Sequence, residues 1–186
     1  MKSFALCAVA ALALSACGSG NDAVDADGDG EISATEAEAA AARVRPLEPG
    51  EYKMNMEIVS IEDPSLSEEE IAKAKQFFGA MSGMAPPRCL SEEEASKGMT
   101  GIAEGLQQGD CDTTSLTTNE DGMQGTMVCK GRDGEARITI DSKTTDTESQ
   151  MTMNVVEPAA GGGEKNVVMK IGMTRVGDCT TDAPAR

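Results

Sequence analysis

The chain has 186 residues, which is enough for one domain with a hydrophobic core and too few for two domains of ordinary size. It carries 32 acidic and 16 basic residues and a formal net charge of -16, so it would repel phosphate backbones, and nucleic acid is not an expected partner. Histidine and tryptophan are absent, which excludes His-based catalytic triads, His-containing zinc sites and haem held by an axial histidine.

Residues 1–16 have the layout of a secretory signal peptide. Lys2 precedes an apolar run over residues 4–14 that is too short to span a bilayer, and small residues follow it. Leu14-Ser15-Ala16-Cys17 resembles the bacterial lipobox, which implies cleavage after Ala16 and acylation of Cys17. Gly18 in the next position is similar to lipoproteins sorted to the outer membrane. We expect Cys17 to anchor the chain in the cell envelope, facing the periplasm; the alternative is an ordinary cleavage site beside a chance cysteine.

Residues 25–36 match the twelve-residue EF-hand calcium loop at every position. Gly30 stands where the loop turns sharply, and Ile32 stands at the apolar position that packs against a partner. Alternating carboxylates converge on one hard cation, a backbone carbonyl and a hydroxyl complete the shell, and the last glutamate binds through both oxygens. The expected calcium ligands are therefore Asp25, Asp27, Asp29, Glu31, Ser33 and Glu36. The alternative is an acidic, glycine-rich linker.

The loop resembles half an EF-hand. Ser33 and Glu36 form a Ser-x-x-Glu capping box, which predicts an exiting helix to about Arg43. Too few residues separate Cys17 from Asp25 for an entering helix, so we expect modest affinity, with a dissociation constant of about 10⁻⁴ to 10⁻³ M. We assign residues 17–47 to a lipid-anchored tether outside the main domain. Calcium would then order the tether and leave the melting of the main domain unchanged.

Short runs of alternating apolar and polar residues, separated by turn residues, predict antiparallel strands over residues 48–180. The expected fold is mainly β (α+β): a meander sheet of five or six strands with one or two covering helices, followed by a flexible tail over residues 181–186. The side chains expected on the buried face are Tyr52, Met54, Met56, Ile58, Met123, Met127, Cys129, Ala136, Ile138, Ile140, Met151, Met153, Val155, Val167, Met169, Ile171 and Met173. Methionine must fill much of this core, because aromatic residues are scarce.

Two helices are expected inside this domain. Ser67 and Glu70 form a capping box before an amphipathic stretch that runs to Met81, and this helix should cover the sheet. A second, shorter helix should start at Ser91 and end at Gly98.

Four cysteines remain outside the leader and the anchor, which implies two disulfides in an exported chain. Three pairings are possible. A hairpin turning at residues 119–122 places Cys111 opposite Cys129 within about one residue of register, close enough for a cross-strand disulfide. Cys89 would then pair with Cys179. None of the four lies in a C-x-x-C pair, so a zinc or iron–sulfur site is not expected.

The residues over about 48–180 resemble the proteobacterial envelope lipoproteins of domain-of-unknown-function family 3617. The motifs that carry this resemblance are Pro49-Gly50-Glu51-Tyr52, Met84-x-Pro86-Pro87-x-Cys89-Leu90-Ser91, the Cys111 and Cys129 pair followed by Lys130-Gly131, and Arg175-Val176-Gly177-Asp178-Cys179. The family usually has tryptophan where this chain has Tyr52 or Met127. The resemblance supports the fold and the disulfides and implies no mechanism.

Three classes of function remain. The anchor, the disulfides and the calcium loop favour a calcium-binding envelope lipoprotein whose β domain binds an envelope protein or a small ligand, or is structural. A copper-handling protein is the alternative, because Met54 with Met56 and Met151 with Met153 offer soft thioethers, although this spacing also suits core packing. An enzyme is the third class, but the acidic run 92–94 is better explained as favourable charge at a helix N-terminus.

Overall fold

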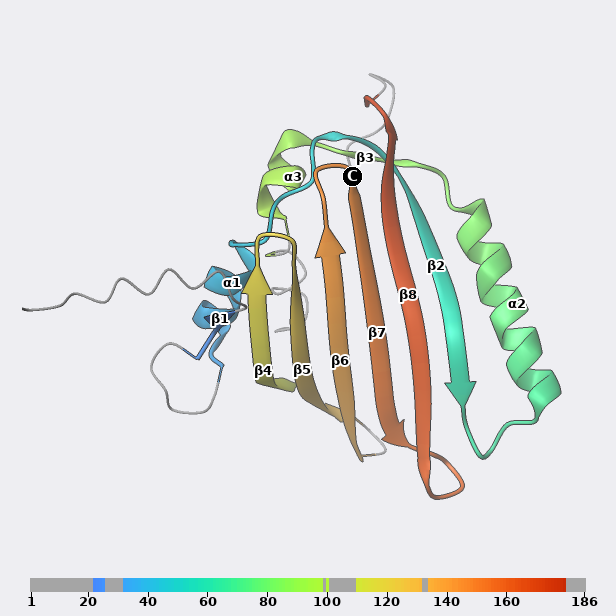
Figure 1. Cartoon of the computed structure of the whole chain (residues 1–186). Helices are drawn as coiled ribbons and strands as arrows, with labels where there is room; N and C mark the ends of the chain where they lie inside the picture. The colour runs from blue at the N-terminus through green and yellow to red at the C-terminus, as the bar shows by residue number, and fades with distance from the viewer. Residues whose placement is uncertain (1–21, 26–31, 99, 101–109, 132–133, 180–186) are drawn as a thin grey trace, which may run out of the picture.

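The computed structural model describes residues 22–25, 32–98, 100, 110–131 and 134–179 (Figure 1). These residues form a mainly β fold around one antiparallel sheet, in the strand order β1-β4-β5-β6-β7-β8-β2-β3. The bounds are β1 (Asp22–Ala23), β2 (Gly50–Glu62), β3 (Arg88–Leu90), β4 (Cys111–Asn119), β5 (Gly122–Gly131), β6 (Gly134–Thr144), β7 (Glu148–Pro158) and β8 (Glu164–Gly177). The predicted fold class is confirmed.

The sheet is a meander for most of its width. Strands β4 to β8 follow one another in chain order, and β2 then pairs with β8. Six strands have nine residues or more, in agreement with the five or six expected. The edge strands β1 and β3 have two and three residues. They were not predicted, because so short a segment cannot show the alternation that identifies a strand.

The pairing register separates an apolar face from a polar one. Met127 lies opposite Ile138, and Met153 lies opposite Met169, so the side chains expected on the buried face do share one face of the sheet. The other face carries polar side chains such as Gln124, whose amide donates to Asp141 Oδ2 at 2.9 Å. A sheet with one apolar and one solvated face is the usual arrangement for antiparallel strands.

Helix α1 (Ala34–Ala41) covers part of the apolar face beside β4. Ala40 and Ala41 are 0% and 1% exposed, and Val44 just after the helix is 3% exposed. They pack in one cluster with Leu116 and Met127 of the sheet. The expectation that this helix stands outside the β domain is therefore corrected. Its alanines have small side chains, which let the helix approach the strands closely.

Helix α2 (Glu68–Met84) begins at the predicted capping box and lies along the outer edge of β2 (Figure 1). Lys75 Nζ donates to the Val59 carbonyl at 2.7 Å, and Ser82 Oγ accepts from the Met56 amide. These bonds occupy backbone groups that an uncovered edge strand would offer to another chain. Phe77 stays 60% exposed, so α2 covers an edge rather than the apolar face. Within the described residues, no helix combines the length and apolar character needed to cross a bilayer.

Tyr52 is the largest fully buried side chain among the described residues, at 1% exposure. Its hydroxyl donates to the Glu48 carbonyl at 2.7 Å, which fastens the segment before β2 to the sheet. Burial raises the pKa of Tyr52; the charge of Arg175 opposes this shift, and that of Glu48 adds to it.

This raised pKa predicts a loss of stability in alkali. The contribution is fully present below the unfolded-state pKa of about 10 and disappears as the pH rises through the higher folded-state pKa. In urea unfolding between about pH 8 and pH 11, the free energy of unfolding of the parent should fall as the pH rises. The fall should be smaller in Tyr52→Phe, which has no phenol to ionise. Tyr52 is the chain's single tyrosine, so tyrosinate absorbance reports its ionisation directly. Tyrosinate forming at or below its ordinary pKa in the folded protein would contradict the prediction.

Candidate functional site

The segment before the candidate calcium loop is fixed to the sheet. Strand β1 pairs with β4, with Asp22 opposite Thr118. The Val24 amide then donates to the Leu116 carbonyl at 3.3 Å, and the Val24 side chain is 5% exposed within the hydrophobic cluster. Asp25, the first expected ligand, therefore follows directly on a residue that is held by both its backbone and its side chain.

The segment after the loop is fixed to the same cluster. Ile32 packs against the buried cluster, and Ser33 caps α1. Glu36 Oε2 accepts from the Ser33 amide at 2.9 Å and from Ser33 Oγ at 2.8 Å, so the predicted capping box is formed. The Glu36 carboxylate is thereby turned back towards the residues that precede the helix.

The structure describes only half of the expected calcium ligands. Asp27, Asp29 and Glu31 lie outside the described residues, as does Cys17, so the structure places Asp25, Ser33 and Glu36 only. The Ser33 hydroxyl and the Glu36 carboxylate are joined by the capping-box hydrogen bond, so two of the expected ligands lie side by side. No group of three or more acidic or Cys side chains among the described residues could hold a metal. Calcium binding would therefore require Asp27 and Asp29.

No sequence pattern indicated which element stands in the place of an entering helix. In the structure that place is taken by β1 and the buried Val24. The one available signal was an apolar valine inside an acidic stretch, next to the first ligand.

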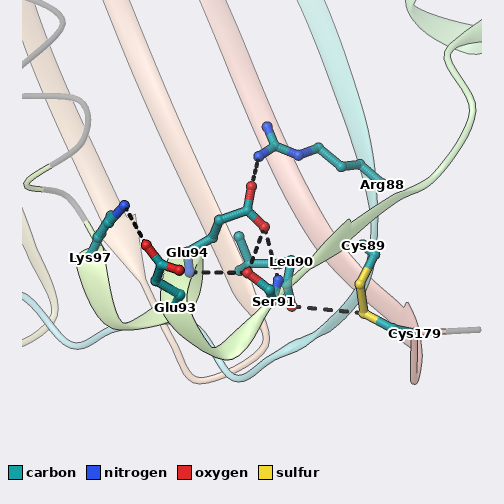
Figure 2. A network of polar contacts seen from close by, with 8 residues as sticks. All are labelled: Arg88, Cys89, Leu90, Ser91, Glu93, Glu94, Lys97 and Cys179. Carbon is teal, nitrogen blue, oxygen red and sulfur yellow. Dashed lines mark hydrogen bonds and ion pairs between the residues drawn. A yellow bond between two sulfur atoms is a disulfide. The ribbon is translucent and has the colours of Figure 1, made fainter. Parts of the chain in front are cut away.

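Both predicted disulfides are present. Cys111 lies directly opposite Cys129 in the β4–β5 pairing and is bonded to it. Cys89 of β3 is bonded to Cys179, which follows β8 (Figure 2). The second bond joins two segments that lie 90 residues apart in the sequence.

The residues that follow Cys89 form a polar network around α3 (Glu92–Lys97), shown in Figure 2. Glu94 Oε2 accepts from the Ser91 amide and from Ser91 Oγ, each at 3.0 Å, while Glu94 Oε1 accepts from the Arg88 guanidinium. The Ser91 amide bond, the Arg88 bond and the Ser91 hydroxyl bond, in that order, lower the pKa of Glu94. This carboxylate therefore stays ionised and holds α3 against β3. The helix ends at Gly98, as predicted, with a positive φ of 49°.

Comparison with known proteins identifies one family. A family model described as "Protein of unknown function (DUF3617)" matches residues 47–179. This range contains α2, α3 and the strands from β2 to β8, and it leaves out the predicted leader, the candidate calcium loop and α1. No curated protein and no solved structure matches the chain. The predicted membership of this family over about residues 48–180 is thus confirmed.

Proposed function

Because the chain belongs to the DUF3617 family, whose description assigns no activity, we propose a function from its own residues. We propose that it is a calcium-binding lipoprotein of the cell envelope, anchored through Cys17, in which bound calcium fastens the sheet to its anchor segment. The observation that carries this proposal is that Val24 and Ile32, on either side of the loop, pack on one hydrophobic cluster.

The charge of the loop supports a cation in it. Asp25, Asp27, Asp29 and Glu36 bring four carboxylates within twelve residues, and these repel one another unless a cation lies between them. Calcium accepts six to eight oxygen ligands, which this set supplies with the Glu31 carbonyl and the Ser33 hydroxyl. Because both ends of the loop are held, less conformational entropy is lost on binding than in a free tether. This favours the tighter end of the range, about 10⁻⁴ M.

The position of the loop gives calcium a mechanical role. Asp22 is five residues after Cys17, so the edge of the sheet lies within about 18 Å of the proposed lipid attachment point. Bound calcium would join the edge strand β1 to α1 on the apolar face and thereby fix the orientation of the sheet at the membrane.

Calorimetric titration of residues 18–186 with calcium tests this function. One site should appear, with calcium preferred over magnesium, and Glu36→Gln should weaken binding by at least about tenfold because it removes the bidentate carboxylate. Glutamine is also accepted at this place in a capping box, so α1 should remain intact. Glu38→Gln is the matched control, because it removes the same charge from an exposed position of the same helix. An absence of heat at millimolar calcium, or equal weakening by both variants, would refute the proposal.

A further inference from the structure

A cavity lies on the apolar face of the sheet, away from the candidate calcium loop, where β3 and α3 approach the ends of β6, β7 and β8. It measures about 360 Å³ and has mostly apolar walls that include Leu47, Leu90, Ala95 and Met173. Its volume is that of about twelve water molecules in the liquid. Pockets for small ligands begin at about this size.

Three basic side chains line this cavity. Arg45, Arg88 and Lys97 line it with one carboxylate, that of Glu94, in a chain with twice as many acidic as basic residues. The three basic side chains are 38%, 62% and 56% exposed, so their charged ends remain accessible to a ligand. Their present partners are surface carboxylates: Arg45 pairs with Glu120, Asp121 and Asp146, Arg88 pairs with Glu94, and Lys97 pairs with Glu93. Ion pairs of this kind are weak, so an anionic ligand can share or displace them.

The apolar wall continues beyond the cavity along the face of the sheet. Met173 lies opposite Met54 of β2, and Met169 and Met56 follow on the same face. Met54 is 39% exposed. Among the described elements, no helix makes an extended contact with β7 or β8. Methionine side chains are flexible and adapt to apolar ligands of different shapes.

We propose that this cavity binds a single acyl chain with an anionic head. The chain lies against Leu90 and Met173, and the head lies among Arg45, Arg88 and Lys97. An apolar wall selects the chain, and the cations select the sign of the head, since a negative head can share or replace their carboxylate partners and an uncharged head cannot. The proposal depends on neither calcium binding nor lipidation of Cys17.

Binding of matched ten-carbon amphiphiles below their micelle concentrations tests the proposal. Decanoate and decyl phosphate distinguish a carboxylate from a phosphate head, while decanol and decyltrimethylammonium have the same chain with a neutral or a positive head. On residues 18–186, which contain every described element, decanoate or decyl phosphate should bind one-to-one and at least about tenfold more tightly than decanol. The cationic probe should not bind.

Variants locate the site. Arg88→Gln and Lys97→Gln should each weaken binding of the anionic probe by about tenfold and leave decanol unchanged. Lys53→Gln is the matched control, because Lys53 is an exposed lysine on the polar face, opposite Thr174 of β8. Ser149→Leu fills the cavity and should weaken binding of both probes.

Four results would overturn the proposal. They are equal binding of decanol and the anionic probes, no binding of any probe, equal weakening by Lys53→Gln and Lys97→Gln, and a dimer of this chain that excludes the anionic probes. Lys97 is an exposed side chain whose partner, Glu93, lies in the same helix, so Lys97→Gln keeps the test decisive even if Ser149→Leu does not fold or Arg88→Gln displaces α3.

Discussion

Removal of the Cys89–Cys179 disulfide by Cys89→Ser with Cys179→Ser should lower the free energy of unfolding by about 4 to 5 kcal/mol. Removal of Cys111–Cys129 by the same substitutions should cost only about 3 kcal/mol. The difference follows from sequence separations of 90 and 18 residues, because a longer closed loop restricts the unfolded chain more strongly. Urea unfolding of the two double variants measures both values.

The two disulfides should also differ in how strongly they restrain the segments that they join in the folded protein. Strand β3 pairs with β2 over three positions only, from Gly50 to Tyr52, so Cys89–Cys179 is a main restraint on β3 and on the cavity beside it. Cys111–Cys129 joins strands that already pair along most of their length. Loss of the first bond should therefore also weaken binding of an anionic amphiphile, while loss of the second should not. A larger loss of stability from the Cys111–Cys129 variant would contradict this assignment.

The sequence predicted the features that depend on neighbouring residues. Alternation over long strands predicted both the strands and the face on which Met127 and Met153 lie. Serine and glutamate at the right spacing predicted where α1, α2 and α3 begin, because a capping box is made within four residues. The hairpin also predicted the Cys111–Cys129 bond, since one turn sets the register of both strands.

Features that depend on distant residues were not predicted. The alanine-rich sequence of α1 is typical of a solvent-exposed helix. Ala40 and Ala41 are buried only because the helix packs on the apolar face of the sheet beside β4. Phe77 is spaced as part of an apolar face, yet α2 meets an edge rather than a face and leaves it exposed. The cavity brings together Arg45, which precedes β2, and Met173 of β8, and no local pattern encodes a contact between residues so far apart in the sequence.

The packing of α1 leads to a second large effect, which concerns calcium. At tenfold to hundredfold excess over the dissociation constant, calcium should raise the free energy of unfolding by about 1.4 to 2.7 kcal/mol. A ligand stabilises a fold when it binds the folded state and not the unfolded one. Here the loop joins Val24 to α1, and both belong to the hydrophobic cluster of the sheet. This replaces the expectation from sequence that the main domain would melt unchanged.

Urea unfolding in calcium and in chelator measures this effect on the parent, on Glu36→Gln and on Glu38→Gln. The parent and Glu38→Gln should gain stability with calcium, whereas Glu36→Gln should not, although its capping box remains possible. If calorimetry shows a site but unfolding does not respond to calcium, the loop is a tether that binds the ion without coupling to the sheet. The buried Ala40 and Ala41 argue against that outcome, because the helix that carries Glu36 cannot separate from the sheet without exposing them.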